Sequence, residues 1–200
     1  MKIKMKIKIR IKMGTPAFPN PHTYTTTSPM KLLTAILATA ALTAFTFAAD
    51  APLAVGAPAP EITAKDQDGK AVDFKKVYAQ GTTLVYFYPK ADTPGCTKQG
   101  CSLRDNWDAL KAKGVQVVGV SGDKPEAQKA FREKFTFPFP LIADDDGKVA
   151  AAFGVPAMKP GIYKRTSFLV KGGKVVWNMT EKTTTDTHAA DVLKGVESLK

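Results

Sequence analysis

The two cysteines of this 200-residue chain lie close together, at positions 96 and 101, directly after a segment typical of a buried strand. Residues 82–88 read Thr-Thr-Leu-Val-Tyr-Phe-Tyr, a β-branched and aromatic run that favours the interior of a sheet. Pro89 ends this run, because proline cannot donate a hydrogen bond to a central ladder. Any fold of this chain therefore has to lead a buried strand straight into the segment that carries both thiols.

The cysteine segment itself predicts a helix. Thr93 is a residue type that caps helix N-termini, and Pro94 suits the first helical position. We expect one helix that runs to Gly114 and buries three apolar residues at helical spacing, Leu103, Trp107 and Leu110. Cys96 falls in the first turn, where free N–H groups and the helix dipole stabilise a thiolate, the reactive form of cysteine.

Cys101 lies on another side of the predicted helix. Ideal geometry places it about 140° round from Cys96, with the two Cα atoms roughly 8.6 Å apart. We therefore expect its side chain to point toward Asp105 and Asp108 rather than into the core. A disulfide closes without backbone movement only below about 7 Å, so a bond between the two cysteines requires the helix to unwind. Gly100 favours unwinding, since glycine in a helix costs about 1 kcal/mol relative to alanine.

The motif Pro89-x-x-x-Thr93-x-x-Cys96 resembles the active-site signature of the peroxiredoxins. Further similarities are the second cysteine five residues later, Leu103-Arg-Asp and Arg165-Thr-Ser-Phe-Leu-Val170. From about Val55 to its C-terminus the chain is similar to the bacterioferritin-comigratory, or peroxiredoxin Q, subfamily. This resemblance implies an α/β fold of the thioredoxin-like class, with a central mixed β-sheet flanked by helices and an N-terminal β-hairpin.

The resemblance also implies an enzyme, a thioredoxin-dependent peroxidase of the atypical two-cysteine type. Cys96 would be the peroxidatic nucleophile that becomes a sulfenic acid, and Cys101 would resolve it as an intramolecular disulfide. Thr93 would hydrogen-bond the peroxide, Pro89 would shield the thiolate, and Arg165 would stabilise the thiolate and the polarised peroxide. Hydrogen peroxide and organic hydroperoxides are the implied substrates and a thioredoxin-type protein the implied reductant, with no cofactor and no metal. Resolution within one helix is compatible with a monomer, which we expect.

Other functions fit parts of this pattern. A thiol-disulfide oxidoreductase of thioredoxin type uses C-x-x-C, whereas four residues separate the cysteines here. A periplasmic metal-binding protein on the same fold needs a histidine ligand near the pair, and His188 is the candidate. For single residues the simpler interpretations are that Thr93 only caps the helix, that Arg165 is a surface residue and that Cys101 is a bystander.

The net charge of +11 does not indicate a nucleic-acid partner. Residues 1–48 carry seven basic and no acidic residues, which leaves 22 basic and 18 acidic residues in the remainder. No stripe of alternating basic and aromatic residues accompanies the lysines, so a solvated mixed surface is the better interpretation.

The first 48 residues have the composition of leader and targeting sequence. We interpret residues 1–29 as a leader produced by an over-extended start, with translation beginning at Met30. Residues 30–48 resemble a secretory signal, because Lys31 precedes an uncharged stretch that ends in small residues near Ala48. An uncleaved membrane anchor is the alternative. We therefore expect a secreted, periplasmic protein with no membrane contact after cleavage, a flexible lead-in over residues 49–56 and a single domain over residues 57–200.

The remaining pattern alternates strands and helices, which indicates an α/β fold. We expect a hairpin around Asp66-Gln-Asp-Gly69, strands over residues 115–120, 141–143, 166–170 and 174–177, and a last helix from about Thr187. A helix capped by Asp123 should face the core with Ala127, Ala130, Phe131 and Phe135. The acidic run Asp144-Asp-Asp-Gly147 lacks the later bidentate acid of a calcium loop, so no calcium site is expected.

Overall fold

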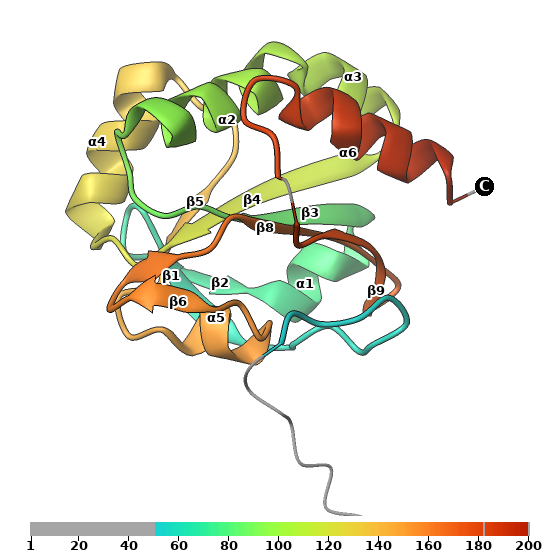
Figure 1. Cartoon of the computed structure of the whole chain (residues 1–200), viewed down its shortest axis with the longest axis horizontal. Helices are drawn as coiled ribbons and strands as arrows, with labels where there is room; N and C mark the ends of the chain where they lie inside the picture. The colour runs from blue at the N-terminus through green and yellow to red at the C-terminus, as the bar shows by residue number, and fades with distance from the viewer. Residues whose placement is uncertain (1–50, 182, 200) are drawn as a thin grey trace, which may run out of the picture. The chain divides into compact units, whose positions relative to one another are not determined.

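In a computed structural model the protein is described over residues 51–181 and 183–199 (Figure 1). The strands of its main sheet are β1 Thr63–Asp66, β2 Ala71–Asp73, β3 Thr82–Phe87, β4 Val115–Ser121, β5 Leu141–Ala143, β8 Thr166–Lys171 and β9 Lys174–Met179. A separate hairpin consists of β6 Ala157–Lys159 and β7 Ile162–Tyr163. The helices are α1 Phe74–Ala79, α2 Pro94–Asp105, α3 Trp107–Ala112, α4 Pro125–Phe135, α5 Lys148–Ala152 and α6 His188–Glu197.

The seven strands of the main sheet lie in the order β2-β1-β5-β4-β3-β8-β9. The central strands β3, β4 and β5 are parallel, while β8 joins β3, and β1 joins β5, in antiparallel pairs. The sheet is therefore mixed, as the sequence predicts. The predicted N-terminal hairpin is also confirmed, because β1 and β2 pair antiparallel across a turn that closes at Gly69.

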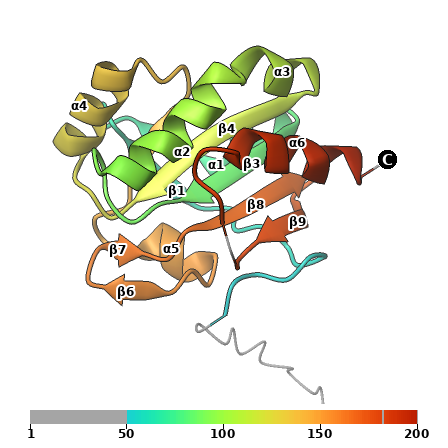
Figure 2. The ribbon, with the colours of Figure 1, turned by 45° about the horizontal axis from the view of Figure 1, so that its top comes forward.

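Helices cover both faces of the sheet (Figure 1). The alternation of side chains along β3 explains this, because successive residues of a strand point to opposite faces. Val85 and Phe87 belong to a first core cluster that α1 and α5 cover, and Leu84 and Tyr86 belong to a second core cluster under α2, α3, α4 and α6. In Figure 2 the helices α2 and α6 cross the same face, and they are in contact.

The helix expected to run from the cysteine motif to Gly114 is interrupted. Asn106 separates α2 from α3, with φ −107° and ψ 19°, so the prediction of one continuous helix is wrong. The side-chain amide of Asn106 donates to the carbonyl of Ser102 at 2.9 Å, an example of how asparagine competes with the backbone for hydrogen bonds. Leu103 and Leu110 are nevertheless both buried in the second core cluster, as expected.

The expected cap of the next helix is also wrong. Helix α4 begins at Pro125 with Lys124 as its N-cap residue, not at Asp123. The carboxylate of Asp123 instead accepts hydrogen bonds from the backbone N–H of Ala91 and from the Ser121 hydroxyl, each at 2.8 Å. Asp123 therefore connects two loops rather than capping a helix.

The buried face of α4 differs from the predicted face. Phe131 is buried and Phe135 half-buried, but Ala127 and Ala130 are exposed. Gln128 is buried instead, because its amide donates to the Ser121 hydroxyl and to the carbonyl of Ile142, each at 2.8 Å. A hydrophobicity pattern misses such a residue, since glutamine is buried here only through its hydrogen bonds.

Residues 51–59 run along the domain and turn at Val55 and Gly56. The N–H of Leu53 donates to Phe153 at 3.1 Å, and the N–H of Gly56 donates to Val175 at 2.8 Å. The predicted leader and signal segments lie outside the described residues, so the proposed division of the chain stays a prediction. Among the described helices, none combines the length and apolar character that a membrane crossing requires.

Candidate active site

The loop between β3 and α2 is tied to its surroundings on three sides. The N–H of Tyr88 donates to Val120 at 3.1 Å, which keeps the chain beside β4 after β3 has ended. The N–H of Ala91 donates to Asp123 at 2.8 Å. Asp92 has a left-handed φ of 55° and pairs with Lys134 at 2.7 Å. These contacts define where α2 begins.

Cys96 is the third residue of α2, in the first turn where the sequence predicts it. Its side chain is buried, with 2% of the residue exposed, and contacts the second core cluster. Pro94 occupies the first turn as predicted. Thr93 stands at the N-cap position, but its hydroxyl makes no capping bond and donates to the carbonyl of Lys90 at 3.0 Å. The lone pairs of the Thr93 oxygen remain available to an incoming donor.

Arg165 reaches Cys96 from the segment just before β8. Its Nη2 atom donates to the Sγ of Cys96 at 3.3 Å, and its Nη1 atom donates to Oε1 of Gln99 at 2.7 Å. Gly95 leaves room for this approach, because a Cβ at that position would lie 2.8 Å from Nη2. Two residues 69 positions apart in the chain are therefore in direct contact, and Arg165 is not a surface residue without a partner.

Two residues near Cys96 were not predicted as part of a peroxidase site: Gln99, and His188, which the sequence offered only as a metal ligand. The Nε2 atoms of these two side chains lie 3.5 Å apart, and the Ser167 hydroxyl lies 3.2 Å from the same nitrogen of His188. Gln99, Ser167 and His188 are all fully buried. Gln99 could have been suspected, because it is a polar residue one helical turn after Cys96. His188 lies 89 residues after Gln99 in the chain, so no local pattern connects the two.

Burial also sets the charge of His188. It lowers the pKa of this imidazole to about 4; Asp191 opposes the change and the Arg165 guanidinium adds to it. His188 is consequently neutral near pH 7. His188 is the candidate metal ligand of the sequence, and in the structure its Nε2 atom has Gln99 and Ser167 as hydrogen-bond partners.

Cys101 is half-buried and packs against the second core cluster, so the expectation that it points away from the core is wrong in part. Both cysteines are free thiols. Burial raises the pKa of the Cys101 thiol, while the nearby Arg104 guanidinium works in the opposite direction. Arg104 pairs with Asp105 and donates to the carbonyl of Phe135, each at 2.8 Å, which ties the second half of α2 to the end of α4.

Pro89 and Thr93 are half-buried residues of the loop that leads into α2. Among the described residues, Arg165 donates the hydrogen bond that reaches the sulfur of Cys96. The structure thus brings Arg165 to Cys96 and places Pro89 and Thr93 on the same loop. Their individual roles stay predictions.

The acidic run after β5 has a structural role. The carboxylate of Asp144 accepts from the N–H groups of Val149 and Ala150, each at 2.9 Å, and from the Tyr163 hydroxyl. Burial raises the pKa of Asp144, and these hydrogen bonds act against that increase. Across residues 51–181 and 183–199 we find no cluster of three His, Cys, Asp or Glu side chains that could hold a metal ion.

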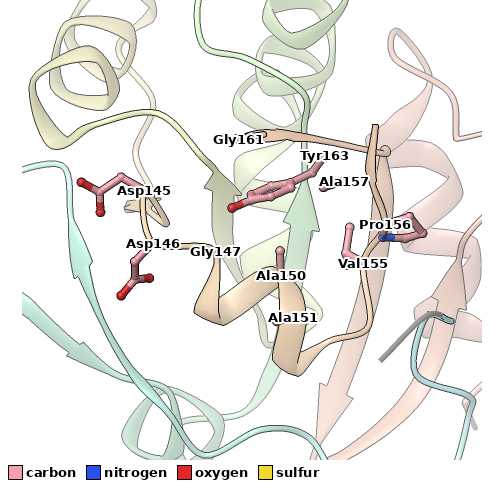
Figure 3. A pocket seen from close by; sticks show the side chains of 10 residues that line it. All are labelled: Asp145, Asp146, Gly147, Ala150, Ala151, Val155, Pro156, Ala157, Gly161 and Tyr163. Carbon is pink, nitrogen blue, oxygen red and sulfur yellow. The ribbon is translucent and has the colours of Figure 1, made fainter. Parts of the chain in front are cut away.

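A hollow of about 470 Å³ lies between α5 and the β6–β7 hairpin (Figure 3). Asp145 and Asp146 stand on the loop before α5, and Tyr163 lies opposite on β7. The residues that line it include neither cysteine and not Arg165. The hollow therefore contains none of the site residues predicted from the sequence.

Comparison with known proteins agrees with this fold. The AhpC/TSA family profile matches residues 55–178. Peroxiredoxin Bcp of Escherichia coli (strain K12) is 43% identical over 148 residues, which cover 71% of this chain and 94% of the relative. The chloroplastic peroxiredoxin Q of Populus jackii is 40% identical over 148 residues, covering 72% and 68%. The crystal structure of peroxidoxin BcpB from Mycobacterium tuberculosis has a TM-score of 0.69 at 31% identity and covers 73% of this chain and 97% of that chain.

The chain belongs to the AhpC/TSA family, and its fold is the thioredoxin-like fold of the peroxiredoxins. Within that family its relatives are the peroxiredoxin Q and Bcp proteins. The resemblance inferred from the sequence is confirmed. The protein is an enzyme that reduces peroxides through a cysteine thiol, and the alternatives of a disulfide oxidoreductase or a metal-binding protein are not favoured.

Proposed function

We propose that Cys96 is the peroxidatic cysteine of this peroxidase. The observation that carries the proposal is the hydrogen bond from Arg165 to its sulfur, 3.3 Å long, at a buried position in the first turn of a helix. A guanidinium beside sulfur stabilises the thiolate, and the helix N-terminus contributes in the same direction. Both effects favour the form of cysteine that attacks peroxides.

In the reaction the Cys96 thiolate attacks one oxygen of the peroxide. The S–O bond forms as the O–O bond breaks, the sulfur is oxidised by two electrons to a sulfenic acid, and the leaving alkoxide or hydroxide takes a proton to become an alcohol or water. Arg165, a permanent donor, stabilises the negative charge that moves from sulfur to the leaving oxygen. Hydrogen peroxide and organic hydroperoxides both contain the O–O bond that this step needs.

Thr93 and Pro89 contribute from the loop before α2. The Thr93 hydroxyl already donates to Lys90, so its oxygen acts as the acceptor for the O–H of the bound peroxide. Pro89 follows the buried Tyr88 and has no N–H to solvate, which helps to keep water away from the thiolate.

Cys101 resolves the sulfenic acid. Its thiolate attacks the sulfur of Cys96, the disulfide forms, and the sulfenic oxygen leaves as water after protonation. Both cysteines lie within α2, where an ideal helix separates their Cα atoms by roughly 8.6 Å. Since disulfides need less than about 7 Å, α2 must unwind locally before the bond can close.

A thioredoxin-type dithiol returns the disulfide to two thiols and completes the cycle, because reduction needs two electrons that the chain itself does not supply. Both reacting cysteines belong to one chain, so a monomer suffices for turnover. The pattern of residues 30–48 supports export to the periplasm with cleavage near Ala48. Intact mass of the exported protein should give an N-terminus at Ala49 or Asp50, and a mass that retains Met1 would contradict cleavage.

The decisive experiment is intact mass of the reduced protein before and after one equivalent of hydrogen peroxide. The parent protein should lose two hydrogens, as the disulfide forms. Cys101→Ser should gain one oxygen, as the sulfenic acid persists, and Cys96→Ser should show no change. A Cys96→Ser variant that still consumes peroxide would refute the assignment of the nucleophile.

A further inference from the structure

A chain of hydrogen bonds leads from the nucleophile into the interior of the domain. Nη2 of Arg165 donates to Sγ of Cys96 at 3.3 Å, and Nη1 of the same guanidinium donates to Oε1 of Gln99 at 2.7 Å. Nε2 of Gln99 then lies 3.5 Å from Nε2 of His188. The four residues come from α2, the segment before β8 and the first position of α6.

The chemistry of the groups determines the direction of each bond. Arginine has only donors, so Gln99 must turn its carbonyl oxygen toward Arg165 and its NH₂ group toward His188. Nε2 of His188 is then assigned as the acceptor, which requires a neutral imidazole with its proton on Nδ1, an atom that has no hydrogen-bond partner among the described residues. The Ser167 hydroxyl, 3.2 Å away, donates to the same nitrogen.

The surroundings of His188 keep it in this neutral form. The side chain is completely buried, and its pKa is lowered to about 4, chiefly by burial. The groups that face it are Gln99 of α2, Ser167 of β8 and the ring of Tyr86 of β3, with centroids 6.1 Å apart. Two charged groups lie nearby: Asp191 raises the pKa of His188 and Arg165 lowers it. The uncharged backbone of Thr184 also raises it.

We propose that His188 is a positioning residue for peroxide reduction, because it holds the Gln99 amide in the orientation that anchors Arg165 against Cys96. This proposal rests on the proposed function of Cys96. Without an acceptor at position 188, the Gln99 NH₂ group loses its buried partner, and the amide is held from one side only, by Arg165. The anchor of the guanidinium is then less firmly fixed. His188 itself does not touch the peroxide.

Three variants separate this role from a purely structural one. His188→Phe keeps an aromatic ring against Tyr86 but removes the acceptor. His188→Gln restores an acceptor oxygen near the position of Nε2. Gln99→Glu replaces the amide with a carboxylate, which offers an acceptor oxygen to Arg165 in either orientation and therefore does not need His188 to orient it.

Two rates at pH 7 report on the site. Each is measured on protein whose folded state has been verified by urea unfolding. The first is sulfenic acid formation with hydrogen peroxide in a single turnover, and the second is alkylation of Cys96 by iodoacetamide, followed by mass. We expect His188→Phe to lower both rates about tenfold, which corresponds to about 1.4 kcal/mol. His188→Gln should recover most of the loss. In the Gln99→Glu background, His188→Phe should change either rate less than about threefold.

Two results would overturn the proposal. One is a His188→Phe protein that reacts with peroxide and iodoacetamide at the parent rates. The other is an equal tenfold loss in the Gln99→Glu background, which would mean that His188 does not act through the amide of residue 99. Neither result resembles a failure of the proposed function, in which the parent protein itself would form no sulfenic acid on Cys96.

Discussion

Gly100 is pressed against the ring of Phe137. A Cβ atom at position 100 would lie 2.5 Å from Cζ and 2.9 Å from Cε1 of that ring. The ring cannot easily move, because it is stacked on Phe139, with centroids 5.4 Å apart and planes 9° apart, and on Phe135. The glycine that weakens the helix between the two cysteines is therefore also required by the packing of α2 on the core.

Gly100→Ala should destabilise the protein. Helix propensity alone predicts a gain of about 1 kcal/mol, but an extra methyl group in a well-packed core typically costs about 1–3 kcal/mol, and here it meets a stacked ring. Urea unfolding measures the balance. Lys98→Ala, at an exposed position of the same helix, is the matched control and should stay within about 0.5 kcal/mol of the parent. Adding Phe137→Leu should recover part of the loss, and a more stable Gly100→Ala protein would contradict the packing argument.

Arg165→Lys should slow the reaction of Cys96 with hydrogen peroxide by roughly 10–100-fold. A single ammonium lacks the two-pronged geometry with which the guanidinium contacts Gln99 and Cys96 together. Single-turnover kinetics at pH 7 give the rate. Lys164→Ala is the control, since this neighbour pairs with Glu181 at 2.7 Å and should leave the rate unchanged. If Lys164→Ala reacted slowly with hydrogen peroxide and Arg165→Lys reacted at the parent rate, Lys164 and not Arg165 would be the cation that assists Cys96.

Thr93→Val should lower the same rate by roughly 10–100-fold, the loss expected when a hydrogen bond in a charged transition state is removed. Valine keeps the shape of threonine but offers the peroxide no acceptor. Thr93→Ser retains the oxygen and should keep most of the rate. If both variants reacted like the parent, Thr93 would serve only to place the start of α2.

The folded protein should lose stability as the pH falls from about 6.5 to about 4. His188 has an ordinary pKa near 6.5 when unfolded and about 4 when folded, so between these values the unfolded chain binds more protons. The contribution of this group is fully present above pH 6.5 and disappears toward pH 4, by on the order of 3 kcal/mol. Urea midpoints of the parent and of His188→Phe, compared at several pH values, should show a shallower acid slope in the variant. Parallel curves would exclude His188 as the source.

Much of the fold could be predicted from local patterns. Three features depend on neighbouring residues: strand β3 over residues 82–87, the Gly-Gly hairpin between β8 and β9, and the position of Cys96 in a first helical turn. The errors arise from side-chain hydrogen bonds, two of which join distant parts of the chain. The side chains of Asp123 and Asn106 form hydrogen bonds, which a hydrophobicity pattern does not reveal. Gln128 is buried because of its hydrogen bonds and not because of apolar character.

The sequence by itself determined that Cys96 lies in the first turn of a helix directly after a buried strand, because Pro89 and Pro94 restrict the backbone at their own positions. The kind of chemistry was implied by the resemblance to a family. Only the tertiary structure decided which polar groups surround Cys96. Arg165 and His188 meet Cys96 and Gln99 across 69 and 89 residues. Such contacts depend on how β3, β8, α2 and α6 pack, since a buried hydrogen bond forms only where the fold brings a donor and an acceptor together.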